Sequence, residues 1–204
     1  MPRRMTASGA TSMGIEDVGV VPAADRPLHR GRTSEPMIYR PVQPADRERL
    51  MAFHESLSEE SVYRRFHGLL PHLTPAAAAS FTTAGTGGRH AWAAFAPGAD
   101  STDQALVAVA RAEPSSAGAE VAVVVTDAWQ GQGVARRLLG FLAADLCREG
   151  RQRVYLDVQV DNVRMLALVP SEARLCTLPP EEGCLRIYVD PRVWRRALAR
   201  GAGP

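Results

Sequence analysis

Residues 121–142 constrain the fold of this chain more than any other segment. They read VAVVVTDAWQGQGVARRLLGFL, which is a run of valines, a short bend with two glycines, and then leucines at helical spacing. The valines predict a buried β-strand, and the leucines predict an amphipathic helix. The backbone N–H groups of such a bend converge at the positive end of the helix dipole, where an anion is stabilised. We therefore interpret the bend as a binding site for a diphosphate.

Composition excludes several classes of protein. The chain has 204 residues, 46% of them hydrophobic, so it is long enough for one domain and too apolar to be disordered throughout. A net charge of +2 predicts no general attraction to nucleic acid or to a membrane surface. No apolar run is long enough to span a bilayer. Three cysteines form neither an even set nor a C-x-x-C pair, which predicts reduced thiols in a cytoplasmic protein: Cys147, Cys176 and Cys184.

The two ends of the chain differ in pattern. Residues 1–36 are rich in Gly, Pro, Ser and Thr and show neither helical nor alternating periodicity, so we expect a disordered tail. This tail is either genuine or the product of an early start codon. Residues 37–204 are predicted to form the folded domain.

Hydrophobic periodicity predicts a mixed α+β order within that domain. Strands are expected at 37–40, 90–95, 105–112, 120–125, 153–160 and 184–189, with a turn at 113–118. Helices are expected at 47–57, 58–68, 75–81, 134–149, 162–168 and 193–199. The expected N-caps are Asp46, either Ser58 or Ser61, and Thr74. This order is not that of a doubly wound parallel sheet.

The glycine bend matches neither of the common nucleotide-binding motifs. No G-K-[ST] follows it, and its spacing is not G-x-G-x-x-G. It resembles the Gln/Arg-x-x-Gly-x-Gly/Ala signature of the GCN5-related N-acetyltransferases (GNAT), and both flanking elements agree with that family. The matching stretch is Gln130, Gly131, Gln132, Gly133, Val134 and Ala135. The resemblance implies a mixed, mostly antiparallel sheet flanked by helices, with splayed strands at an acetyl-CoA site.

The same resemblance implies acetyl-CoA as the acyl donor. No metal is expected, because His67 and His72 have no third ligand nearby. The diphosphate would be held by backbone amides of the bend, and the pantetheine arm by free backbone groups near Val123 and Val125. Asn162 begins an N-x-x-M pattern and would face the thiol arm, which is compatible with a second role as a helix N-cap. The amides assigned to the diphosphate belong to Gln132, Gly133, Val134, Ala135 and Arg136.

A second stretch, LSEESVYRRFHG, resembles the L-S-x-x-S-x-Y-x-R-F-F segment in the acetyltransferase domains of bacterial protein-lysine acetyltransferases. The matching residues are Ser58, Ser61, Tyr63, Arg65 and Phe66, with His67 in the last position. This resemblance implies a primary amine as acceptor, with a protein lysine favoured, and Glu120 as the general base. A base is required because lysine has a pKa of about 10.4, so about one amine in a thousand is neutral near pH 7.4.

Several alternatives stay open at this point. Glu120 also fits a solvated carboxylate at a strand end, and the acceptor also fits a small amine such as a polyamine or an antibiotic. No tyrosine lies between Asn162 and Arg186 to serve as general acid, and Pro170 shortens the following helix. A non-catalytic acyl-CoA sensor and a plain interaction module are therefore rival hypotheses. The chain has no lysine, which indicates either a GC-rich genome or protection from self-acetylation.

Overall fold

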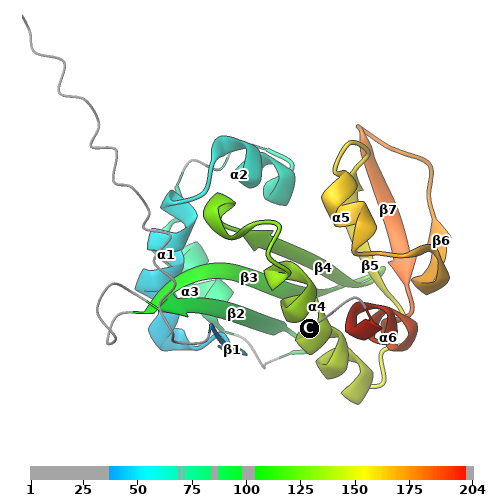
Figure 1. The fold of residues 1–204 in the computed structure, drawn as a ribbon, viewed down its shortest axis with the longest axis horizontal. Coiled ribbons are helices and arrows are strands. Elements are labelled where there is room, and N and C mark those ends of the chain that lie inside the picture. The colour runs from blue at the N-terminus through cyan, green and yellow to red at the C-terminus, as the bar shows by residue number, and fades with distance from the viewer. Residues whose placement is uncertain (1–36, 69, 71, 84–86, 98–103, 201–204) are drawn as a thin grey trace, which may run out of the picture. The chain divides into compact units, whose positions relative to one another are not determined.

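A seven-stranded sheet organises the part of the chain that the structure, a computed structural model, describes: residues 37–68, 70, 72–83, 87–97 and 104–200 (Figure 1). The predicted tail lies outside these residues, and so does part of residues 85–88, whose GTGG sequence predicts a turn. The strands are β1 (Ile38–Pro41), β2 (His90–Pro97), β3 (Gln104–Ser115), β4 (Gly118–Val125), β5 (Val154–Gln159), β6 (Arg174–Thr177) and β7 (Cys184–Val189). Their order across the sheet is β1-β2-β3-β4-β5-β7-β6.

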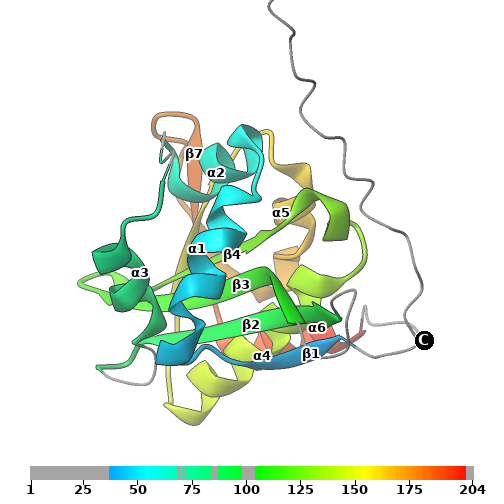
Figure 2. The same ribbon diagram turned by 90° about the vertical axis from the view of Figure 1, so that its left-hand side faces the viewer.

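Helices cover both faces of this sheet (Figures 1 and 2). One core holds the buried leucines of α4 and the apolar face of α6, and the other holds residues of α1 and α3. The α-helices are α1 (Arg47–Glu55), α2 (Glu59–Phe66), α3 (Pro75–Thr82), α4 (Val134–Arg148), α5 (Val163–Ala167) and α6 (Pro191–Arg200). Short 3-10 turns are η1 (Pro44–Asp46), η2 (Asp127–Trp129) and η3 (Ser171–Ala173).

Strand β4 contributes to both cores, as its run of valines predicts. Val121 and Val125 belong to the core beneath α4, while Val124 packs against the core beneath α1 and α3. Because side chains alternate along a strand, Glu120 shares the face of Val124 and lies on the side of α2.

The neighbouring strands β4 and β5 diverge almost as soon as they meet. They are the parallel pair in a sheet whose other neighbours are antiparallel, and they register at one position, Glu120 with Tyr155. Beyond that position the strands part, and α2 and α5 lie on either side of the opening (Figure 1). The predicted α+β class, with a mostly antiparallel sheet and splayed strands, is confirmed.

Two strand assignments differ from the prediction. Strand β3 continues through residues 113–115, which were expected to form a turn, and the hairpin closes where Ser115 pairs with Gly118. Strand β6 was not predicted. Its residues are mostly exposed and lack an alternating pattern, because β6 is an edge strand that pairs with β7 alone.

Asp46 is not the side-chain cap of α1 that the sequence suggested. It lies at the end of η1, is 1% exposed, and makes no capping hydrogen bond to α1. Its carboxylate instead accepts two hydrogen bonds from the Arg40 guanidinium, both 2.7 Å, and one of 2.8 Å from the Gln43 N–H. A buried carboxylate requires such partners, and the Arg40 hydrogen bonds lower the pKa of Asp46 below its ordinary value.

We predict that Asp46→Asn lowers the free energy of unfolding at pH 7 by about 2–3 kcal/mol, since it removes a buried charge from a bidentate pair. The folded-state pKa of Asp46 is lowered, so its contribution is complete above the unfolded pKa of about 4 and is lost as pH falls below it. The difference between wild type and variant should therefore shrink in urea denaturation at pH 3. Glu172→Gln, which removes an exposed pair with Arg200, is the control and should change stability by less than about 0.5 kcal/mol. A difference that stays constant from pH 7 to pH 3 would contradict the assignment.

Candidate functional site

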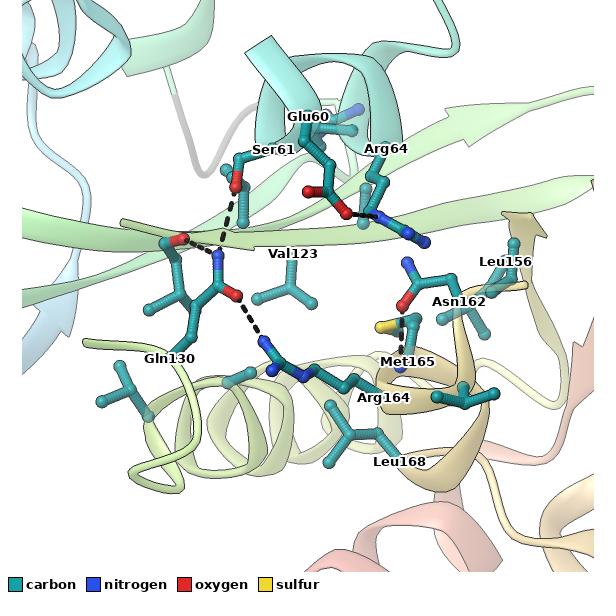
Figure 3. Close-up of a pocket in the computed structure, with 18 of the residues that line it drawn as sticks. Glu60, Ser61, Arg64, Val123, Gln130, Leu156, Asn162, Arg164, Met165 and Leu168 are labelled. Carbon is teal, nitrogen blue, oxygen red and sulfur yellow. Dashed lines mark hydrogen bonds and ion pairs between the residues drawn. The ribbon is translucent and has the colours of Figure 1, made fainter. Parts of the chain in front are cut away.

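A large pocket opens where β4 and β5 part. It has a volume of about 1120 Å³, and its walls come from α2, β4, the bend before α4, β5 and α5. Figure 3 shows α2 above the opening and α5 facing it, with Val123 of β4 between them. Most of the predicted site residues line this one pocket: Glu120, Val123, Val125, Gln130, Gly131, Gly133, Val134, Ala135, Arg136 and Asn162.

The N-terminus of α4 has no side-chain cap. Gly133 is its N-cap residue, and the first helical backbone bond there is from the Arg137 N–H to the Gly133 carbonyl at 3.1 Å. Helices α2, α3 and α5, by contrast, are capped by the side chains of Ser58, Thr74 and Asn162. The first N–H groups of α4 thus have no intrahelical acceptor and lie at the positive end of the helix dipole.

The bend before α4 has room for an anion. Gly131 and Gly133 have φ angles of +74° and +78°, which L-residues rarely adopt. A Cβ atom placed at either glycine would meet no atom within 4 Å among its described neighbours. The two glycines are therefore required by backbone conformation rather than by crowding, and the space beside them is open.

Gln130 and Gln132 have different surroundings. The Gln130 side chain lies in the pocket wall, where its Nε2 donates to the Val125 carbonyl at 3.1 Å. The Gln132 Nε2 donates to the Ala128 carbonyl at 2.9 Å, back toward η2, and Gln132 does not line the pocket. The part predicted for Gln132 is thus restricted to its backbone amide.

Asp127 joins the bend to α2. Its Oδ1 accepts from the hydroxyls of Ser58 and Ser61 at 3.1 and 3.0 Å, and its Oδ2 accepts from the Ser58 N–H at 3.2 Å. The Gln130 Nε2 donates to the same Oδ1 and to the Ser61 hydroxyl, both at 3.1 Å. The two serines of the LSEES segment therefore fix α2 against the bend, while Ser58 also caps that helix.

Glu120 lies at the opposite end of the pocket from the bend. Four residues of β4 lie between it and Val125, and the five residue steps correspond to about 17 Å of extended strand. Its cross-strand neighbour Glu113 is paired with Arg89 and Arg111, whereas no ion pair or hydrogen bond to Glu120 is found among the described side chains. The Glu120 carboxylate is thus available to a substrate.

Arg65 is the cation of α2 that also lines this end of the pocket. Burial lowers the pKa of its guanidinium, and the negative charge of Glu120 opposes that shift. A guanidinium remains protonated despite such a shift, so the site combines one positive and one negative group near the acceptor end.

Sequence reasoning identified Asn162 correctly as a cap, but it missed the arginines around it. The Asn162 Oδ1 accepts from the Met165 N–H at 3.1 Å. Arg64 pairs with Glu60 at 2.9 Å, and the Arg164 Nη1 donates to the Gln130 Oε1 at 2.9 Å (Figure 3). Arg64 also reaches Asp161 on the other wall at 3.4 Å. The one available signal was the position of Arg164 inside the N-x-x-M pattern, and nothing in the sequence paired it with Gln130.

Comparisons with known proteins agree with this geometry. Residues 51–170 match the acetyltransferase (GNAT) family. The GNAT domain of S. lividans PAT is 31% identical, with a TM-score of 0.65, and the match covers 74% of this chain and 89% of that domain. The chain therefore belongs to the GNAT family, and the predicted likeness to bacterial protein-lysine acetyltransferases is supported. It is an N-acetyltransferase with acetyl-CoA as its acyl donor.

Two more distant structures share the fold. YncA of Salmonella typhimurium, a putative acetyltransferase solved with acetyl-CoA, is 16% identical with a TM-score of 0.59; the match covers 77% of this chain and 95% of that chain. PaiA N-acetyltransferase of Thermoplasma acidophilum, solved with coenzyme A, is 12% identical with a TM-score of 0.58; the match covers 76% and 99%. Within the described residues, no helix has the length and apolar content needed to cross a membrane, and no cluster of metal-binding side chains is present.

We predict that Asn162→Ala lowers the free energy of unfolding by about 1 kcal/mol, because the Met165 N–H loses its acceptor. Asn162→Ser retains a capping hydroxyl and should lose less than about 0.5 kcal/mol. Urea denaturation of both variants measures the difference. Equal losses would show that the cap is not what Asn162 contributes to stability.

Proposed function

We propose that this enzyme acetylates the side-chain amine of protein lysines by direct attack on acetyl-CoA, with Glu120 as general base. The observation that carries this proposal is the arrangement of one pocket. An uncapped helix N-terminus lies at one end, an unpaired carboxylate lies at the other, and the opening between β4 and β5 connects them.

The donor half of the pocket has backbone groups for the diphosphate and for the pantetheine arm of CoA. The amides of residues 132–136 would hold the diphosphate, beside Gln130 and Gly131. The Val125 carbonyl accepts from Gln130 on the side away from β3, and backbone groups of alternate residues point the same way. The N–H and carbonyl of Val123 would therefore face the opening and bind the pantetheine arm, with Asn162 on the opposite wall.

The acceptor half supplies the proton acceptor. Glu120 would take a proton from the lysine ammonium, directly or through a water, and the neutral nitrogen would attack the thioester carbonyl carbon. As the tetrahedral intermediate collapses, the C–S bond breaks, and the thiolate takes up the second proton that the nitrogen loses. A thiol pKa near 8.5 makes the thiolate a good leaving group, so the lack of a tyrosine on α5 does not prevent the reaction.

Two features favour a protein lysine over a small amine. The LSEESVYRRF segment of α2 resembles that of the protein-lysine acetyltransferases, and its serines dock on the donor bend. The likeness to the GNAT domain of S. lividans PAT at 31% identity supports the same subgroup. The folded domain over residues 37–204, the tail before it and the cytoplasmic setting remain predictions of the sequence.

The assignment as an N-acetyltransferase disfavours the rival that the sequence left open, a non-catalytic acyl-CoA sensor, and the short α5 is the feature that would fit such a sensor. The helix ends at Ala167, and η3 and β6 replace the longer helix that the family pattern leads one to expect. A sensor would bind acetyl-CoA without turnover.

We predict that Gly133→Ala weakens acetyl-CoA binding by at least 10-fold, because a residue at φ +78° distorts the amides that meet the diphosphate. Gly150→Ala is a matched control, since Gly150 follows the other end of α4, has φ +74° and has no neighbour within 4 Å. Both variants should lose about 1–2 kcal/mol of stability, but isothermal titration should show weaker binding in Gly133→Ala alone. Equal affinity for acetyl-CoA in the two variants would show that the diphosphate does not bind at this bend.

We predict that Glu120→Gln lowers kcat by about 10²–10⁴-fold on a lysine peptide while the Kd for acetyl-CoA changes by less than about threefold. The rate of the variant should rise with pH toward 10, as lysine loses its proton without help. Glu55→Gln, at an exposed position in α1, is the control and should behave as wild type. A wild-type rate in Glu120→Gln would exclude Glu120 as the base, whereas no turnover in the wild type would favour the sensor.

The acceptor class is tested with a panel of amines. We expect a higher kcat/KM for lysine-containing proteins and peptides than for spermidine or aminoglycosides. Because the chain has no lysine, acetyl label transferred from acetyl-CoA to a side-chain amine can be found only on the added acceptor. A higher kcat/KM for spermidine would assign the enzyme to small amines instead.

A further inference from the structure

We infer that Arg164 of α5 is a side-chain ligand of the CoA diphosphate, and that it exchanges its hydrogen bond with Gln130 for one with a phosphate oxygen when the donor binds. This inference rests on the proposed position of the diphosphate at the bend before α4. It adds a charged side chain, from a different element, to a set of proposed diphosphate ligands that are backbone amides.

The orientation of the Gln130 amide places Arg164 beside the bend. The Gln130 nitrogen must face the Val125 carbonyl and the Asp127 carboxylate, because both of those groups can only accept. The Gln130 oxygen therefore faces the other way and accepts from the Arg164 Nη1 at 2.9 Å. Figure 3 shows the Arg164 side chain extending from α5 across the pocket toward Gln130, the residue directly before Gly131.

The positive charge at the N-terminus of α4 is too small to balance a diphosphate, so the Arg164 guanidinium can supply part of the rest. A diphosphate diester carries two negative charges, and the N-terminus of α4 supplies only about half a positive charge. Of the two arginines that begin α4, Arg136 lines the pocket, while Arg137 lies over the ring of Tyr39 at 5.6 Å. Arg64 is engaged by the carboxylates of Glu60 and Asp161.

Arg164 differs from Arg64 in its partner. Among the described residues it forms no ion pair within 4.0 Å, and its one side-chain partner is a neutral amide oxygen. The Gln130 oxygen is neutral, whereas a phosphate oxygen carries negative charge and adds Coulomb attraction to the hydrogen bond, so a phosphate oxygen is a better partner for the guanidinium than Gln130. The side chain is exposed and long, so it can turn from one acceptor to the other without a change in α5.

This exchange would tie α5 to the loaded donor. Arg164 is the second residue of the short helix α5, and Asn162 is the N-cap of the same helix. A bound diphosphate would thus hold, through Arg164, the same helix that presents Asn162 to the pantetheine arm.

The test is the affinity of Arg164→Ala for three probes, measured by isothermal titration: CoA, dephospho-CoA and pantetheine. We expect about 10-fold weaker binding of CoA and of dephospho-CoA, and unchanged binding of pantetheine, which has no diphosphate. The affinity of Arg164→Ala for CoA should also depend less steeply on salt concentration than that of the wild type. Arg164→Lys should lie between the two, because it keeps the charge and loses the planar guanidinium.

Arg196→Ala is the control, since Arg196 is exposed on α6 and does not line the pocket. It should bind all three probes as the wild type does. An unchanged CoA affinity in Arg164→Ala would overturn the inference, as would an equal loss for pantetheine or a loss seen with CoA but not with dephospho-CoA. If Gly133→Ala still weakens CoA binding in those cases, the diphosphate position stands and only the role of Arg164 fails.

Discussion

The divergence of β4 from β5 is the constraint on which the rest of the site depends. Two parallel strands normally satisfy each other's backbone groups along their whole length, but here the register ends at Glu120 and Tyr155. The unpaired edge of β4 would be costly if it were buried without partners. A pocket at this opening keeps the edge accessible, so the same departure from regular pairing creates both the space for a substrate and the groups that bind it.

Helix α2 spans that opening and has residues at both of its ends. Ser58 and Ser61 bond to Asp127 and Gln130 beside the glycine bend, and Arg65, one turn after Ser61, lies at the end where Glu120 is found. One rigid element therefore sets the distance between the bend and the acceptor end. The serines are the residues of the LSEES segment that the family resemblance identified, and their contacts give that pattern a structural reason.

The sequence predicted the bend and its helix well because their signals are local. A valine run, two glycines and a leucine period each report a short-range preference, and Asn162 was identified as a cap for the same reason. Asp46 was assigned wrongly, because its partner Arg40 comes from a different element and no local pattern reports that pair. Strand β6 and the contact between Arg164 and Gln130 were missed for the same physical reason, since both depend on residues brought together only by the tertiary fold.

The N-terminus of α4, which has no side-chain cap, links donor binding to the stability of the whole domain. This 15-residue helix packs four fully buried leucines into the larger core, yet its first turn lacks the acceptor that a serine or asparagine gives other helices. A donor molecule seated there would complete the helix in the manner of a missing capping residue. Occupancy and conformational stability are then thermodynamically linked, so the resistance of the enzyme to unfolding would follow the concentration of its own substrate in the cell.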